Sequence, residues 1–134
     1  MTGYVLDTNI LSLILRRNAN LDARLKAIIR PENIIWGCPI VWYELRRGLL
    51  ANDAKMQMRL FEELFATFNW DDFTRADWSL AANWWMKRRN AGLPVSDADL
   101  MIAVFAYNRD AVLVTNNAKD FQLLDVHLEN WATD

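Results

Sequence analysis

Short apolar runs alternate along the chain with segments whose apolar residues recur at helical spacing. The runs at residues 4–6, 33–38 and 111–115 are predicted strands, because each is brief and continuously apolar. The segments of helical period are predicted helices, and they cover residues 8–17, 21–30, 39–50, 54–68, 74–90 and 96–110. Residues 68–72 fit either a strand or a turn, and residues 116–134 have a mixed pattern.

Strands that alternate with helices predict an α/β fold. Continuous apolar strands are typical of a parallel sheet, so we expect a central, mostly parallel sheet flanked by helices on both faces. The chain has 134 residues and no repeat or linker, which predicts a single domain over residues 1–134. In such sheets, ligands bind beyond the carboxyl ends of the strands, where the strand order reverses.

The charge, the cysteine content and the length of the apolar runs restrict the classes of protein that the chain can belong to. The formal net charge is −2 and the pI is about 5.4, so any nucleic acid must bind through a local patch or a bridging cation. The one cysteine, Cys38, excludes an internal disulfide and fits a reducing compartment. No apolar run reaches about 18 residues and no signal peptide is evident, so we expect a cytoplasmic protein without a membrane span.

Two acidic residues lie close to predicted strand ends. Asp7 directly follows the first strand in YVLDTN, where it can cap the next helix or belong to a site. Glu44 lies about one turn into the helix that follows the second strand. An i, i+3 ion pair with Arg47 is its alternative explanation.

Two more acidic residues have similar alternatives. Asp99 stands three residues after Ser96, which is the spacing of a capping box, although Asp reaches less far than the usual Glu. Asp97 can serve the helix dipole equally well, so two acids in this first turn exceed what capping requires. Asp120 follows the strand at 111–115 and can be part of a solvated turn.

Considered together, the four acids predict a cation site. Two carboxylates about 4 Å apart repel by roughly 4 kcal/mol at an effective dielectric constant of 20. A cluster of them therefore has to bind protons or divalent cations. Ligands that are all oxygen favour Mg²⁺ or Mn²⁺ over zinc.

Other kinds of chemistry have weaker support. No glycine-rich phosphate loop is present, and His127 has no Ser or Cys spaced as a nucleophile partner. Cys38 follows a strand and is expected to be buried rather than reactive. An aspartyl-phosphate enzyme is disfavoured because Asn9 stands where a second acid is needed, and Asp53, the mid-chain acid a receiver domain would need, lies between helices.

The helix at residues 74–90 is rich in tryptophan and ends in three basic residues. Its spacing predicts Trp78 and Trp85 on the inward face and Trp84 on another face, where it would cover a partner or a second core edge. The basic residues 87–89 fit either a solvated helix end, which suits the helix dipole, or a grip on a phosphate backbone.

The four acidic motifs, in order, resemble those of the PIN domain family. They are LDTNI with Asp7, YEL with Glu44, GLPVSDADLMIA with Asp99 and LVTNNAKDF with Asp120. The resemblance is closest to the VapC toxins of toxin–antitoxin modules and covers nearly the whole chain, including LENW at residues 128–131. It implies a metal-dependent endoribonuclease. Asp7, Glu44 and Asp99 match the family's firm acidic positions, and Asp120 matches the more variable fourth one.

The resemblance also implies supporting residues and a mechanism. Asn9, Thr115 and Asn117 match polar positions that support the site. One or two Mg²⁺ or Mn²⁺ ions would be held chiefly by Asp7 and Asp99, with Glu44 and Asp120 acting directly or through water. The candidate RNA contacts are basic residues, namely Arg46, Arg47, Lys87, Arg88 and Arg89. Many relatives carry a glycine shortly before the third acid, where this chain has Val95-Ser96-Asp97.

The family further implies a homodimer and a small antitoxin that lays a helix across a groove and blocks the site. The helix at 54–68, which is rich in Met and Phe, suits such a surface or a plain core stripe. The RNA substrate is not specified by the sequence, although the TNN motif suggests a structured RNA such as a tRNA. The alternative function is a catalytically inactive PIN-like module that binds RNA or protein.

Overall fold

The central sheet has five parallel strands in the order β3-β2-β1-β4-β5. The computed structural model of the protein describes residues 2–131, and its strands are β1 (Gly3–Leu6), β2 (Ile34–Gly37), β3 (Asn69–Trp70), β4 (Ala111–Thr115) and β5 (Leu128–Asn130). The chain adds β2 and β3 on one side of β1, then returns to add β4 and β5 on the other. The strand order therefore reverses between β1 and β4, and residues following these strands meet at one edge of the sheet.

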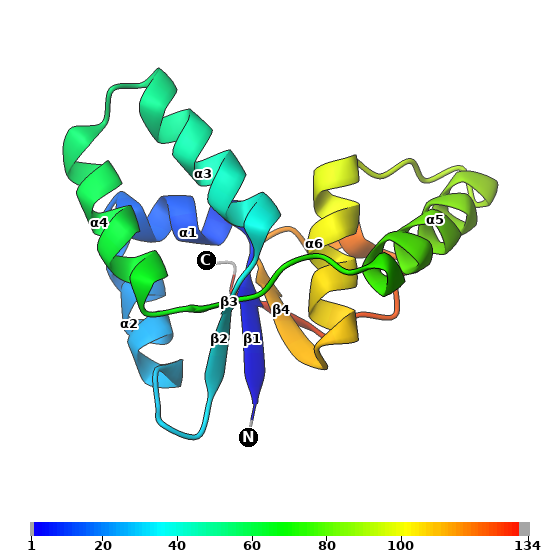
Figure 1. Cartoon of the computed structure of the whole chain (residues 1–134), viewed down its shortest axis with the longest axis horizontal. Helices are drawn as coiled ribbons and strands as arrows, with labels where there is room; N and C mark the ends of the chain where they lie inside the picture. Colours follow the sequence, from blue (N-terminus) through cyan, green and yellow to red (C-terminus); the bar gives the residue numbers. More distant parts are fainter. Residues whose placement is uncertain (1, 132–134) are drawn as a thin grey trace.

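Helices flank the sheet on both sides, as the sequence predicts. The first four helices lie on one side and the last two on the other (Figure 1). This separation is what right-handed crossovers between parallel strands produce when the chain reverses direction. The helices are α1 (Thr8–Leu15), α2 (Ala19–Ile28), α3 (Pro39–Ala51), α4 (Lys55–Ala66), α5 (Arg75–Asn90) and α6 (Asp97–Asn108), and the short 3₁₀ helix is η1 (Ala118–Phe121).

The predicted elements agree closely with the structure. Every predicted helix is present, and its ends lie within two residues of the predicted ends. Residues 68–72 contain the short strand β3, and the mixed tail contains η1 and β5. The predicted domain limits at residues 1 and 132–134 lie outside the described residues. Within residues 2–131, no helix is long and apolar enough to cross a membrane.

Helix α6 is the central helix of the core. Its residues 100–106 are all buried, because the helix packs on β1 and β4 and is covered by α5 and α3. A helix buried on every side needs no polar face, which explains the continuous apolar run LMIAVFA. The first turn of α6, which carries Asp99, is therefore held in place by the core.

The predicted orientation of the tryptophans in α5 was wrong. Trp84 is 6% exposed, whereas Trp78 is 56% and Trp85 is 41% exposed. The buried residues of α5 are Asp77, Ala81, Trp84 and Arg88, at helical spacing. Two of these four are charged, so an apolar pattern alone pointed to the wrong face.

A buried ion pair joins the start of α5 to the end of α6. The Asp77 carboxylate accepts hydrogen bonds from Thr74 N (2.8 Å), Asn108 Nδ2 (2.7 Å) and Arg109 Nη2 (3.1 Å). Arg109 Nε also donates to Asp71 (2.9 Å). Burial alone raises the pKa of Asp77, but the bonds from Arg109, Asn108 and Thr74 outweigh it and lower that pKa. The pair fixes the α5–α6 unit, and α6 carries Asp99.

Candidate active site

Asp7 lies between β1 and α1, at the point where the strand order reverses. Its Oδ1 accepts a hydrogen bond from Ile10 N (2.9 Å), so the predicted helix cap is present. The residue is only 6% exposed, and it stands beside Thr115, the fully buried last residue of β4. Burial raises the pKa of Asp7 from its ordinary value of 3.8 to about 6, against the hydrogen bonds from Thr115 and Ile10 N, and the nearby charges of Asp99 and Asp120 add to the rise.

Asp99 lies in the first turn of α6. Its backbone N–H donates to Ser96 Oγ (3.1 Å), which is half of the predicted capping box. Burial raises the pKa of Asp99, and the charges of Asp120 and Glu44 raise it further, while Ser96 and Arg88 act in the opposite direction. The helix is therefore capped by the Ser96 side chain. The pKa of the Asp99 carboxylate is raised by burial and by the charges of the neighbouring acids.

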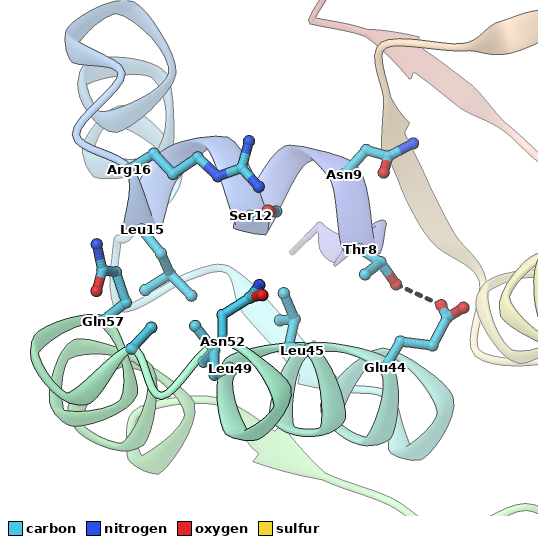
Figure 2. A pocket seen from close by; sticks show the side chains of 12 residues that line it. Thr8, Asn9, Ser12, Leu15, Arg16, Glu44, Leu45, Leu49, Asn52 and Gln57 are labelled. Atoms are coloured by element: carbon cyan, nitrogen blue, oxygen red, sulfur yellow. Dashed lines mark hydrogen bonds between the residues drawn. The ribbon is translucent and has the colours of Figure 1, made fainter.

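Glu44 reaches the site from α3. Thr8 Oγ1 donates to Glu44 Oε1 at 2.6 Å, across 36 residues of sequence (Figure 2). The expected ion pair is also present, since Arg47 Nη2 lies 3.7 Å from Glu44 Oε2. Both explanations of Glu44 thus hold at once. Thr8 was not among the predicted site residues, although its place directly after the first acid is a signal that could have identified it.

Asp120 lies in η1, beyond the end of β4. Asn117 Nδ2 donates to Asp120 Oδ2 (2.7 Å), and Asn117 N donates to Thr115 Oγ1 (2.9 Å). The TNN turn therefore orients the fourth carboxylate from the end of the strand. Asn9, the third predicted supporting residue, is exposed in the first turn of α1 and lines a cavity beside the site.

Arg88 does not extend into solvent as predicted for a helix end. It is 5% exposed, and its guanidinium donates four hydrogen bonds, all to backbone carbonyl oxygens. The acceptors are Leu93 (2.6 Å), Pro94 (3.2 Å), Asp120 (2.9 Å) and Gln122 (2.9 Å). A buried guanidinium occupied in this way is not available to RNA, so Arg88 leaves the set of candidate RNA contacts and becomes a support of the site.

The other candidate RNA contacts differ in their exposure and in whether they already form ion pairs. Lys87 and Arg89 are exposed on α5, and Arg89 lies over the exposed ring of Trp85. Arg46 pairs with Glu62 at 3.5 Å on the side of α3 that faces α4. Arg47 is exposed and adjoins the site through Glu44.

The prediction that Cys38 is buried is confirmed. Burial raises the pKa of its thiol to about 12. Such a thiol stays protonated and unreactive at neutral pH. His127, the one histidine, is exposed and lies on the C-terminal segment that leads into β5.

The four acids are close enough to influence one another. Asp7 is affected by Asp99 and Asp120, and Asp99 by Asp120 and Glu44. As the side chains stand, no three Asp, Glu, His or Cys side chains of residues 2–131 are close enough to enclose one ion. The donor set still fits Mg²⁺, because this ion usually takes one or two protein carboxylates and keeps several waters.

The fold and the acids define a class of protein: a doubly wound α/β domain with an acidic site at its switch point. The chain belongs to the PIN domain family, whose match covers residues 4–126. That match contains all four acids.

Named relatives are similar to the chain over almost its full length. Ribonuclease VapC1 of Haemophilus influenzae (strain R2866) is 26% identical over 130 residues, which cover 96% of this chain and 97% of the relative. Ribonuclease VapC2 of Rickettsia felis is 28% identical over the same shares. The crystal structure of VapBC2 from Rickettsia felis, bound to a DNA fragment from their promoter, contains a chain that is 28% identical. It superposes with a TM-score of 0.85 over 97% of this chain and 99% of that one.

Proposed function

We propose that the protein is a metal-dependent endoribonuclease of the VapC type, acting as the toxin of a toxin–antitoxin module. The observation that carries the proposal is the meeting of Asp7, Glu44, Asp99 and Asp120 beyond the ends of β1 and β4. These acids come from four separate parts of the chain. Capping accounts for one contact each at Asp7 and Ser96, and it does not explain why four carboxylates are near enough to affect one another's ionisation.

The raised pKa values of Asp7 and Asp99 are what such a site needs before it binds a cation. Carboxylates kept together in a partly buried place resist ionisation, and a divalent cation removes that resistance. We assign Asp7 and Asp99 as the direct ligands of Mg²⁺ or Mn²⁺, and Glu44 and Asp120 as ligands directly or through water. When bound, the ion supplies an activated water and stabilises charge on the leaving 3′-oxygen.

The remaining polar residues hold the acids in place. Thr8 fixes one oxygen of Glu44, and Asn117 fixes one oxygen of Asp120. The bond from Asn117 uses one oxygen of Asp120 and leaves the other for a water or a metal ion, whereas the second oxygen of Glu44 lies 3.7 Å from Arg47 Nη2. The Asp7 carboxylate is oriented by Ile10 N at the start of α1. A bound divalent ion would supply the activated water, so the site would not require a histidine base.

The relatives named Ribonuclease VapC and the VapBC2 assembly support RNA as the substrate and a small antitoxin protein as the partner. We propose the same partners here, in a homodimer that acts on RNA in the cytoplasm. A structured RNA such as a tRNA is the first substrate to test. Lys87, Arg89 and Arg47 remain proposed contacts to its backbone.

The test is cleavage of total cellular RNA by purified protein in Mg²⁺, in Mn²⁺ and in EDTA. We expect cleavage only with a divalent ion, and products that carry 5′-phosphate and 3′-hydroxyl ends, because a metal-activated water displaces the 3′-oxygen. Equal cleavage in EDTA, or products with 2′,3′-cyclic phosphate ends, would contradict the proposed mechanism. Absence of cleavage in every condition would favour the inactive binding module.

A further inference from the structure

A groove begins at the candidate active site and runs along α1, between α1 and the α3–α4 hairpin. Its volume is about 330 Å³, which is in the range of sites that hold one small molecule. Thr8 and Glu44, joined by their hydrogen bond, form the end next to the acids (Figure 2). Leu15 marks the other end, roughly 10 Å along the helix axis at 1.5 Å per residue.

The lining combines an apolar floor with polar side chains. Leu15, Leu45 and Leu49 form apolar surface between the helices (Figure 2). Asn52 and Gln57 contribute amides from the α3–α4 side. An apolar floor with amides around it suits a flat ring that has hydrogen-bonding edges.

Four polar side chains of the groove have no partner within the described part of the chain. Among residues 2–131, no hydrogen bond or ion pair engages the side chains of Ser12, Arg16, Asn52 or Gln57. All four line the same groove. Their donors and acceptors are therefore free to bind a ligand.

The charges favour a base over the phosphate backbone. Arg16 is the one basic side chain lining the groove, and Glu44 is acidic, so the lining has no excess of positive charge. A track for phosphates needs several Lys or Arg residues. Amides instead pair with the edges of unstacked bases in single-stranded RNA.

We propose that this groove holds one unpaired nucleotide of the RNA beside the phosphate that is cut. The base lies against the three leucines, Asn52 and Gln57 bind its edge, and Arg16 reaches a flanking phosphate. This inference rests on the proposed ribonuclease function and adds to it a site for selecting the nucleotide next to the cut.

Gly48 provides a way to close the groove without disturbing the fold. It lines the groove within α3, and a Cβ at this position would have no atom within 4 Å. Gly48→Leu therefore places a side chain in the open space, while Gly48→Ala is the matched control. Both changes favour the helix, because glycine is unfavourable in a helix interior.

A second variant removes the amides instead of filling the space. Asn52→Ala combined with Gln57→Ala deletes both without affecting a hydrogen bond between side chains of the described residues. Asn83→Ala, an exposed change on α5 away from the groove, is its control. Melting temperatures verify that every variant is folded.

The experiment uses a pool of single-stranded RNA oligonucleotides of random sequence, with the cut ends sequenced and kcat and KM measured. Wild type should show a base preference at one position beside the cut. The double variant should lose that preference and raise KM about tenfold with little change in kcat, which is the expected effect of losing one to two hydrogen bonds. Gly48→Leu should act in the same direction more strongly, and both controls should resemble wild type.

Two results would overturn the inference. If wild type has no preference at that position, or if Gly48→Leu and the double variant keep wild-type KM and preference, the groove does not bind the nucleotide and is left to a protein partner. If wild type cuts neither this pool nor total cellular RNA in Mg²⁺ or Mn²⁺, the proposed function fails as well, which distinguishes the two failures.

Discussion

The guanidinium of Arg88 donates a hydrogen bond to the backbone carbonyl of Asp120 at 2.9 Å, across 32 residues of sequence. The same side chain bonds to the carbonyls of Leu93 and Pro94, in the loop that leads to Ser96 and Asp99. One buried side chain thus connects the segments that carry the third and fourth acids. We interpret Arg88 as a positioning residue of the site.

Replacing Arg88 by Met should therefore reduce both stability and activity. Several backbone carbonyls would lose a charged donor, which we expect to cost roughly 3 kcal/mol, or about 10 °C in melting temperature for a domain of this size. In the folded fraction, kcat should fall more than KM. Arg75→Met, at an exposed position in the first turn of the same helix, is the control and should leave both unchanged. An Arg88→Met protein with wild-type kcat would contradict this role.

Asp7 should make stability depend on pH in an unusual direction. Its pKa is about 6 in the folded protein against 3.8 ordinarily, so the folded state holds the proton more tightly than the unfolded state. The stability that comes from protonated Asp7 is fully present below about pH 4 and is lost as the pH rises through about 6. The loss at pH 7 corresponds to roughly 3 kcal/mol.

Asp7→Asn tests this directly, since Asn still offers an oxygen to Ile10 N but has no charge. In EDTA at pH 7.5 the variant should unfold at a higher denaturant concentration than wild type, and the difference should shrink towards pH 4. Asp125→Asn, at an exposed position, is the control. A variant that is less stable than wild type at pH 7.5 would show that the ionised carboxylate of Asp7 does not destabilise the folded protein.

The Asp77–Arg109 pair should be essential to the fold rather than to the chemistry. Asp77→Ala leaves Arg109, whose side chain is 8% exposed, without its main partner, which usually costs 3–5 kcal/mol. Because the pKa of Asp77 is lowered in the folded state, this contribution is present above its unfolded pKa and lost as the pH falls through the folded one. Urea unfolding of Asp77→Ala and of the control Asp125→Ala measures the difference, and equal stabilities would contradict this account.

Divalent cations should stabilise the folded protein through the four acids. Ions that bind only the folded state raise the melting temperature in proportion to the logarithm of their concentration above Kd. We expect a rise with Mg²⁺ and a larger one with Mn²⁺ in wild type, and a much smaller rise in Asp7→Asn. The same rise in both proteins would place cation binding elsewhere, and no rise in wild type would favour the inactive module.

The sequence predicted those parts of the fold and site that short patterns encode. A strand followed directly by Asp7 and a strand that ends in Thr115 are local features, and the rule for parallel sheets brings their ends together. The role of Arg88 could not be predicted, because a basic residue at a helix end is usually solvated. Its partners are carbonyls whose positions depend on how η1 folds back.

The same limitation explains the error in α5. The buried side of this helix includes two charged residues, Asp77 and Arg88, and each is satisfied by partners from distant segments. A pattern of apolar residues cannot reveal such a stripe. The apolar pattern placed Trp78 and Trp85 on the inward face, but both side chains are exposed in the structure.

The central claim is that Asp99 is a metal ligand of a ribonuclease site, and its first turn provides a matched pair of variants. Asp97 and Asp99 are both acidic residues of this turn, and the carboxylate of Asp99 is the one affected by Asp120 and Glu44. The decisive measurement is the rate of RNA cleavage in Mg²⁺ by Asp99→Asn and by Asp97→Asn. We predict a loss of roughly a hundredfold or more for Asp99→Asn, equivalent to about 3 kcal/mol of transition-state stabilisation, and a near wild-type rate for Asp97→Asn. An Asp99→Asn protein that cleaves RNA as fast as wild type would contradict the assignment.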